Sequence, residues 1–468
     1  MNVQLTNRRR SPEAGVAMLI AIFVLLLIAV VGIALIVSSG TETALAGNYR
    51  SSTVVYYAAL AGLEEARGRL LPKNPNSFNA TIPAPLFPPN VFYITNPANG
   101  ENVLATYPDQ EYGTEFPLSP VPTILGTIPS VSTVAGIQGQ LYRWVRINGV
   151  TEKSLNIDVA NNGMSDPGPL YFDGAHLTPT PTGNQALEIT SLAFLPNGTK
   201  KLLQYVVAPI ALSPNFPAVL TLLGSPGNNV QFTSPGHPDF IVNGNDEYAA
   251  PGCTPGSTPV YAIGYGNGSN ASGINTSPPT QYIGAGSTPS ISDVTASLPS
   301  SFQSVQTLNA LIQNIMQSAD VELSPAPPAT MVTGSALPTT MSASNPMTVV
   351  VNGDLNLTGW NGTGYGLLVV TGTLTYDPGP ATWDGIVLVV GKGNYVSTTN
   401  GFGLISGAML IAQTVDGAGN LLSNFGPASF SQTGNQPAGH GVDYSSCYIK
   451  LSIQTLSYKV LSFREIPQ

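Results

Sequence analysis

The sequence predicts a mainly β protein with a long N-terminal transmembrane α-helix and a β-rich exported region that ends in a β-solenoid. Three observations predict this fold class: an uncharged apolar run from Ala14 to Val37, a composition with 49 Gly, 41 Pro and only 9% charged residues, and an imperfect repeat between residues 347 and 415. Disordered chains combine low hydrophobicity with high net charge. This 468-residue chain does not, so a loop-rich β structure is expected.

The first 15 residues are predicted to be a cytoplasmic leader, and the apolar run after them is predicted to cross a membrane. A hydrocarbon core needs roughly 20 apolar helical residues, which residues 16–37 supply. Arg8, Arg9 and Arg10 precede the run, and the first charge after it is Glu42. Because basic residues stay on the cytoplasmic side, we expect a single-pass protein of the bacterial inner membrane with its C-terminus exported.

A cleaved secretory signal is the alternative interpretation of this region. Ala44-Leu45-Ala46 before Gly47 has the small-x-small form that signal peptidase prefers. The apolar run is longer, however, than the roughly 7–15 residues of a signal's apolar region. A buried core helix fits less well, since soluble helices normally carry a polar stripe.

The helix is predicted to continue beyond the membrane, so that residues 16–71 form one long helix. Glu65 and Arg69 make a favourable i,i+4 pair in this region. Pro72 is a strong stop signal. Residues at alternating spacings of three and four predict one stripe of the helix: Tyr49, Thr53, Tyr56, Leu60, Leu63 and Leu70.

Residues 72–136 are predicted to be an irregular connector with short strands, and residues 137–330 a β-rich domain with one amphipathic helix. An alternating strand is expected over 141–147, and a hairpin over 187–207 with Asn197-Gly198 in its turn. Five apolar residues share one face of the helix expected over 301–319: Leu308, Leu311, Ile312, Ile315 and Met316.

Residues 331–468 are predicted to form a β-solenoid domain with a C-terminal cap. Val349–Leu355 resembles Leu368–Leu374, and apolar strands recur with a period of about 19–21 residues. A short strand and a turn at that period are typical of solenoid coils, because one coil buries its apolar strand only by stacking on the next. An antiparallel meander is the alternative.

Two further features belong to this prediction. The segment Trp360-Asn361-Gly362 returns as Trp383-Asp384-Gly385, which strengthens the repeat. The segment 444–463, with a strand-like run at 458–463, is expected to cap the last coil.

The charge balance and the motifs point away from nucleic-acid binding and catalysis. After residue 15 the chain has 13 basic and 24 acidic residues, a net charge of −11, whereas nucleic-acid binding requires a basic surface. No nucleophile elbow or metalloprotease helix motif occurs. We therefore expect no enzymatic activity, no cofactor and no metal site.

Candidate metal ligands and catalytic carboxylates are sparse. His176, His237 and His440 are isolated, whereas a zinc site needs clustered ligands. Asp354, Asp377 and Asp384 fall mostly at predicted turns, where Asp is common.

Cys253 and Cys447 both lie on the predicted exported side, where oxidation is permitted. A disulfide between them would close a long loop and stabilise the fold by about 4–5 kcal/mol in the chain-entropy description. Two separate buried thiols are the alternative, and the sequence alone does not decide between them.

The N-terminal 70 residues resemble the PilX-type pilus assembly proteins, a minor-pilin group of type IV pilus systems. Three motifs carry the resemblance: Gly15-Val16-Ala17-Met18-Leu19-Ile20, Ala46-Gly47-Asn48-Tyr49-Arg50, and the helix from Ala58 to Ala66. The resemblance implies a leader that prepilin peptidase removes between Gly15 and Val16. It also implies a helix that packs among other pilin helices, for which Gly32 and Ala34 are small contact positions.

Two positions depart from the usual pilin pattern. Ala14 stands where such leaders often have a basic residue, and Ile20 stands where major pilins carry a glutamate. A minor or tip subunit fits Ile20 better than a major subunit does. The expected function is therefore a minor pilin or pilus assembly component whose partners are other pilins, the assembly machinery, prepilin peptidase and the inner membrane. A stand-alone anchored or secreted β-solenoid adhesin is the alternative.

Overall fold

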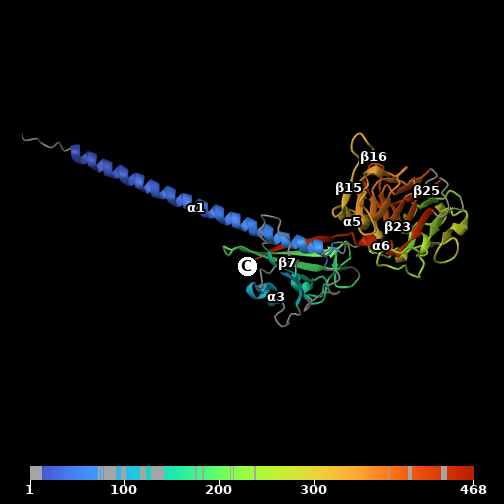
Figure 1. Cartoon of the computed structure of the whole chain (residues 1–468), viewed down its shortest axis with the longest axis horizontal. Coiled ribbons are helices and arrows are strands. Elements are labelled where there is room, and N and C mark those ends of the chain that lie inside the picture. Colours follow the sequence, from blue (N-terminus) through green and yellow to red (C-terminus); the bar gives the residue numbers. More distant parts are fainter. Residues whose placement is uncertain are drawn as a thin grey trace, which may run out of the picture.

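The computed structural model describes residues 13–467 except for 72–73, 75–76, 78–90, 96–101, 116–122, 128–141, 174–175, 182–183, 211, 214, 237–238, 378, 399–402 and 434–439. The structure has two β-rich bodies, and one helix, α1 (Glu13–Arg69), projects from the first of them (Figure 1). The predicted fold class, mainly β with a long N-terminal helix, is confirmed. Most of the predicted leader lies outside the described residues.

The body next to α1, here called the head unit, is built on a six-stranded sheet. Its strand order is β2-β1-β3-β7-β8-β27, and neighbouring strands are antiparallel except β1 and β2. The strands are β1 (Val91–Thr95), β2 (Thr123–Thr127), β3 (Tyr142–Gly149), β7 (Leu187–Phe194), β8 (Lys200–Pro209) and β27 (Tyr458–Ile466). The helices α2 (Val103–Thr106), α3 (Gln110–Glu115) and α4 (Glu152–Leu155) and a small sheet of β4 (Tyr171–Phe172), β5 (Leu177–Thr178) and β6 (Asn184–Gln185) complete it.

The strand expected over 141–147 and the hairpin expected over 187–207 are confirmed as β3, β7 and β8. Gly198 has φ of +88°, a conformation that favours glycine, as the Asn-Gly signal predicts. The predicted connector 72–136 contributes two strands and two short helices to the head unit within its described residues.

The last turns of α1 form the core of the head unit with one face of this sheet. The fully buried stripe is Val55, Ala59, Leu63, Ala66 and Leu70. These residues pack against β-strand side chains such as Val145, Ile189 and Val207. The predicted stripe is therefore correct for Leu63 and Leu70 and wrong for Tyr49, which is 76% exposed. The predicted Glu65–Arg69 pair is present, with Nε and Oε1 2.5 Å apart.

Gly62 lets the helix approach the sheet closely. A Cβ atom at this position would lie 2.3 Å from Ser191 Oγ and 3.0 Å from Tyr142 Cγ. The absence of a side chain therefore sets the distance between α1 and the sheet. Nothing lies within 4 Å of the corresponding point at Gly68, on another face of the same helix.

The second body, here called the stacked-coil unit, consists of parallel strands in two sheets. Each turn of the chain adds one strand to a long sheet and one to a short sheet, and every strand pairs in parallel with its counterpart one turn later. In the long sheet these are β15 (Val321–Leu323), β17 (Met347–Val351), β19 (Thr363–Val370), β21 (Thr382–Gly391) and β23 (Leu404–Val415). In the short sheet they are β16 (Met331–Thr333), β18 (Asp354–Asn356), β20 (Thr373–Thr375), β22 (Asn394–Ser397) and β25 (Ser429–Gln432).

The register agrees with the main sequence repeat. Val349 pairs with Leu368 and Leu355 pairs with Leu374, as the aligned segments predict. The tryptophan repeat is wrong, because Trp383 pairs with Gly364 rather than with the position of Trp360. The antiparallel meander is excluded for these strands, while a closed β-solenoid remains a prediction.

A column of glycines crosses the middle of the long sheet. Gly366, Gly385 and Gly407 face one another on β19, β21 and β23. All three have positive φ values, and a Cβ on Gly385 would lie 2.0 Å from the Gly366 carbonyl oxygen. Beyond β23 the sheet divides at this column. Ile405–Gly407 pairs with β26 (His440–Tyr444), while Met409–Ala412 pairs with β9 (Ala218–Leu223).

Residues before 300 therefore belong to the same stack. β9 is followed across the sheet by β12 (Tyr261–Gly266) and β14 (Ile291–Asp293), while β26 is followed by β11 (Phe240–Asn243) and β13 (Tyr282–Ile283). β10 (Gln231–Thr233) extends the short sheet, and β24 (Leu421–Gly426) is antiparallel to β23. The predicted domain boundary at 330/331 lies inside this unit, because β15 and β16 on either side of it both join the stack.

Two helices cover the stack, and one of them was predicted. The helix α5 (Val305–Met316) buries Leu308, Leu311, Ile312 and Ile315, as its periodicity indicates. The helix α6 (Ser446–Ile453) packs on β19, β21 and β23.

The prediction that the C-terminal strand caps the last coil is wrong. The strand β27 leaves the stack and becomes the edge strand of the head-unit sheet beside β8. Tyr458 and Val460 pack there against the core beneath α1. An alternating strand does not reveal in its own sequence which sheet edge it joins, because the pairing is non-local.

Gly62→Ala is expected to destabilise the full chain by about 1–3 kcal/mol, since the added methyl group overpacks the contact between helix and sheet. The matched Gly68→Ala variant is expected to stabilise it by about 0.5–1 kcal/mol, because alanine is the better helix former. Urea unfolding in detergent micelles, followed by tryptophan fluorescence, measures both. Equal effects of the two substitutions would contradict the close approach at Gly62.

Candidate functional site

The N-terminal part of α1 is the largest exposed apolar surface of the described chain. Every residue from Val16 to Arg50 is exposed except Gly32, which is half-buried. Phe23 is 69% exposed and Ile36 is 74% exposed. Soluble proteins rarely expose a continuous apolar surface of this size, and such surfaces mark membrane or protein contacts. We call residues 16–50 the free segment and residues 55–70 the seated segment.

The free segment is long enough for two different environments. The helix is long and apolar enough to cross a membrane, and residues 16–37 span about 33 Å at about 1.5 Å per residue. Residues 38–50 then extend the helix by about 20 Å more. Leu45 and Tyr49 are 71% and 76% exposed in this outer part. At Ser51 the head unit begins, where Asn197 Nδ2 of the hairpin turn donates to Ser51 Oγ at 2.8 Å.

The four predicted helix positions all lie in or beside the free segment. Gly15 and Val16 are in the first turns of α1, and Val16 is 62% exposed. No atom lies within 4 Å of the Cβ position of Gly32. Gly32 and Ala34 are two residues apart and therefore point to different sides of the helix. One partner helix can use only one of them as a close contact.

A buried arginine joins the head-unit sheet to the helices on its outer face. Arg146 on β3 is fully buried and lies opposite the face that α1 covers. Its Nη1 is 2.8 Å from Asp109 Oδ2, and its Nη2 is 2.6 Å from Glu111 Oε2 and 3.1 Å from Glu188 Oε1. Burial alone would lower the pKa of Arg146, but the three carboxylates raise it, so the guanidinium stays charged. Removing one partner of such a network leaves an unpaired buried charge, which is strongly destabilising.

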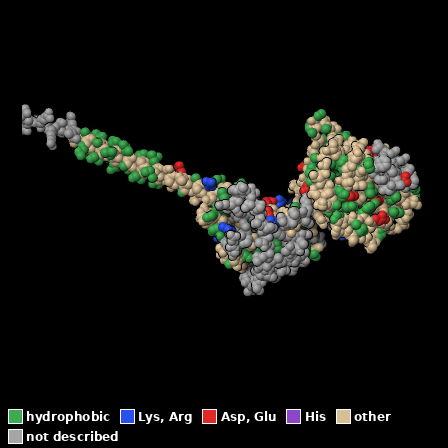
Figure 2. Space-filling model, in the orientation of Figure 1, with side chains coloured by type: hydrophobic (Ala, Val, Ile, Leu, Met, Phe, Trp, Pro, Cys, Tyr) green, Lys and Arg blue, Asp and Glu red, His purple; other side chains and the backbone are tan. Residues whose placement is uncertain are grey.

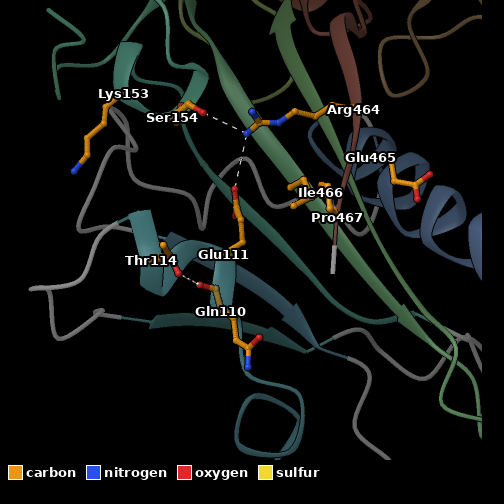
Figure 3. A pocket seen from close by; sticks show the side chains of 9 residues that line it. All are labelled: Gln110, Glu111, Thr114, Lys153, Ser154, Arg464, Glu465, Ile466 and Pro467. Carbon is orange, nitrogen blue, oxygen red and sulfur yellow. Dashed lines mark hydrogen bonds and ion pairs between the residues drawn. The ribbon is translucent and has the colours of Figure 1, made fainter.

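The same network reaches the C-terminal strand and borders a pocket of about 550 Å³. Figure 3 shows Arg464 of β27 reaching toward Ser154 and Glu111 from across the pocket. Arg464 Nη2 donates to the Ser154 carbonyl oxygen at 3.3 Å and lies 3.8 Å from Glu111 Oε1. The pocket walls come from α3, α4 and β27. The charges at its centre are already paired within the protein, so the arrangement holds the three segments together and offers no nucleophile with an adjacent base.

Two buried carboxylates lie in the stacked-coil unit beneath α6. Asp384, Ser406 and Asp443 occupy one row across β21, β23 and β26. Burial raises the pKa of Asp384 and of Asp443 to about 6 in each case. Tyr248 Oη donates to Asp443 Oδ2 at 2.8 Å, and Tyr448 of α6 hydrogen-bonds to Asp384.

The placement of these carboxylates differs from the expectation for the sequence. Asp384 lies inside β21 rather than at a turn, and the turn residue Asp377 is buried and accepts a hydrogen bond from Ser397 Oγ at 2.7 Å. Asp354 starts β18 and pairs with Lys392, with Oδ1 and Nζ 2.8 Å apart. None of the three described pockets is lined by Asp384 or Asp443.

Cys253 and Cys447 form a disulfide between the loop after β11 and the first turn of α6, with Cα atoms 5.6 Å apart. Asp246 strengthens this link, since its Oδ2 accepts from Gly256 N at 2.6 Å and its Oδ1 from Ser446 N at 2.9 Å. Both connections hold α6 against the stack.

The described residues bring no histidines together. His176 directly precedes β5, and its backbone N–H donates to Asp173 Oδ1 at 2.7 Å. His440 is the first residue of β26. His237 lies outside the described residues. Within the part of the chain that the structure describes, no group of three or more His, Cys, Asp or Glu side chains is arranged to hold a metal ion.

The Arg146 network and the buried carboxylate row were not predicted from the sequence. Arg146 alternates with the apolar residues of β3. This alternation predicts a strand, but it does not show which segment covers Arg146. That partner, the segment around Asp109 and Glu111, lies in the predicted connector. The carboxylate row depends on the pairing of β26 with β23, which no local pattern reports.

Comparisons with known proteins add one neighbour. No protein-family model and no curated protein matches the chain. One solved structure, titled the crystal structure of competence-associated pilin ComZ from Thermus thermophilus, aligns with a TM-score of 0.15 and 11% sequence identity. The alignment covers 66% of this chain and 90% of that chain. A likeness of this size carries no argument about fold or function.

The buried carboxylates predict an unusual dependence of stability on pH. The pKa of Asp384 and of Asp443 is about 6 in the folded chain and about 3.9 in an unfolded chain. Folding therefore favours their protonated forms, so their contribution is greatest below about pH 4 and is lost as pH rises through about 6. We expect the free energy of unfolding to fall by up to about 2–3 kcal/mol per carboxylate between pH 4 and 7.

Asp384→Asn and Asp443→Asn are expected to remove this slope, because asparagine resembles the protonated acid, and to raise stability at pH 7.5. Denaturant unfolding of the full chain at several pH values tests this. Glu322→Gln on the exposed side of β15 removes one negative charge at a surface position and serves as the control. A variant with the same pH slope as the original chain would rule out this role for the carboxylates.

Proposed function

We propose that the chain is a non-enzymatic minor pilin or pilus assembly component of a type IV pilus system. In this proposal the free segment inserts first into the inner membrane and then among the helices of other pilin subunits. The head unit and the stacked-coil unit are carried outside the membrane. A PilX-type subunit is the finer form of the proposal and rests on the motifs around Gly15, Gly47 and Ala58.

One observation supports the proposal most strongly: a single continuous helix is exposed and apolar at one end and forms the core of a folded unit at the other. A simple membrane anchor needs only residues 16–37, followed by a linker. Here the helix continues without interruption through residues 38–50 into the seated segment. The exposed Leu45 and Tyr49 in this outer part lie beyond the hydrocarbon core, so a membrane alone does not cover them.

The size of the exported part supports a minor or tip position. Two β-rich bodies follow the helix (Figure 1), and a shaft built of identical subunits would have to accommodate both of them around each helix. Ile20, at the fifth position after the expected cleavage site, removes the carboxylate that would pair with a neighbour's α-amino group. Both features favour a subunit that is present in few copies.

The charge distribution supports the proposed membrane orientation and the proposed partners. The arginines at 8–10 keep the leader in the cytoplasm, and the exported part has its C-terminus outside. The net charge of −11 after residue 15 disfavours a nucleic-acid partner. The expected partners are prepilin peptidase, other pilins and the assembly machinery.

The full-length chain, coexpressed with prepilin peptidase, is expected to yield a mature protein that begins at Val16. Mass spectrometry of the purified protein with and without the peptidase measures the N-terminus. Gly15→Val is expected to block processing, while the control Gly47→Val is expected to leave it unchanged. A mature chain that starts at Gly47 would indicate ordinary secretion, and an intact N-terminus in the presence of the peptidase would indicate a permanent anchor. Either outcome would refute the proposal.

A further inference from the structure

The outer face of the short sheet in the stacked-coil unit carries a regular array of neutral polar side chains. Along β20, β22, β25 and β10 the side chains alternate between buried and exposed or half-buried positions. Seven outward polar residues lie on these strands. One of them, Gln231, is already engaged, since its Nε2 donates to the Asn229 carbonyl oxygen at 3.2 Å. The other six define what we call the hydroxyl face: Thr373, Thr375, Asn394, Ser429, Ser431 and Thr233.

The strand register arranges these residues in two straight rows. Thr373, Asn394 and Ser429 are paired neighbours in the first row, and the second row contains Thr375, Ser431 and Thr233. Neighbouring strands lie about 4.7–4.9 Å apart. The first row therefore presents hydrogen-bonding groups at the strand spacing on three neighbouring strands. The second row does so on three of its four strands, because Val396 occupies the position on β22.

An aromatic stack on the inner side keeps this face flat. Tyr395 and Phe430 stack with ring centroids 4.2 Å apart and an interplanar angle of 3°, and Phe430 and Phe232 stack at 5.0 Å and 16°. All three rings are buried on neighbouring strands. Untwisted sheets need such side-chain ladders to resist the natural strand twist, so the nearly parallel rings indicate that the outer rows lie in one plane.

The side chains of the hydroxyl face have no hydrogen-bonding partners among the residues that the structure describes. Their hydroxyl and amide groups are therefore available to a ligand. Two charged residues beside this face, Asp354 and Lys392, are paired with each other. In Figure 2 the coloured surface of the stacked-coil unit is mostly neutral, with scattered acidic side chains.

These properties select the kind of partner. An ionic ligand would need an unpaired opposite charge, which the hydroxyl face lacks. A protein partner usually needs an aromatic or large aliphatic anchor, and the one aliphatic side chain within the array is Val396. A neutral polymer that carries many hydroxyl groups at regular intervals matches both the charge and the flat, repetitive geometry.

We propose that the hydroxyl face binds a neutral polysaccharide. Each hydrogen bond to the polymer contributes little to the binding free energy, because it takes the place of a hydrogen bond to water. Attachment therefore depends on many simultaneous contacts along one polymer. The face is accordingly expected to retain a polymer but not its free monosaccharide. This inference concerns the stacked-coil unit alone and does not depend on pilus assembly.

The test is sedimentation of the full chain in mild detergent with microcrystalline cellulose, chitin and calcium alginate. We expect retention on at least one of the two neutral polymers, at least tenfold weaker retention on anionic alginate, and no competition by 10-fold excess glucose or N-acetylglucosamine by mass. The double variant Thr375→Lys with Ser431→Lys is expected to reduce retention at least tenfold.

The control is Ser423→Lys with Asn424→Lys, which adds the same charge at exposed positions of β24. Thermal unfolding of both double variants identifies any loss of folding, and a third variant, Asn394→Ala, reports on the face without adding charge. No retention of the original chain on either neutral polymer, or equal loss in the control, would overturn the proposal.

Discussion

The packing of the seated segment of α1 on the head-unit sheet is the contact on which the rest of the structure depends. Because Gly62 has no side chain, the helix approaches Ser191 and Tyr142 closely enough to bury a stripe of five residues. This fixes the direction in which the same helix leaves the head unit. The free segment therefore projects as a straight extension of a folded core rather than as a tethered anchor.

The path of the chain makes the two bodies interdependent. It forms most of the head-unit sheet, winds through the stacked-coil unit, and returns with β27 to complete the first sheet beside β8. Arg464 on that returning strand meets Glu111 and Glu188 of the buried network around Arg146. The disulfide between Cys253 and Cys447 holds α6 to the stack just before this return. The C-terminal residues therefore take part in both units: α6 is bonded to the stacked-coil unit, and β27 completes the head-unit sheet.

The local elements were largely predictable, and their long-range pairing was not. Periodicity placed α5, the β7–β8 hairpin and the strands from Val349 to Leu374, because each pattern is complete within a short segment. The return of β27 and the entry of β9 into the stack involve partners that lie 189 residues or more away in sequence, and no local signal reports them. The same reason explains the site: the apolar free segment is evident in the sequence, whereas Arg146 and Asp443 acquire their partners only through tertiary pairing.

Hydrogen exchange across α1, measured by mass spectrometry on the full chain in detergent micelles, tests the central claim most directly. The account predicts that amides of residues 55–69 exchange as slowly as those of β7 and β8, while amides of residues 38–50 exchange far faster, because an unsupported helix opens readily. Residues 16–37 are expected to be protected by the micelle. Equally fast exchange over residues 38–50 and 55–69 would contradict the account, since the seated segment would then not be part of the head-unit core.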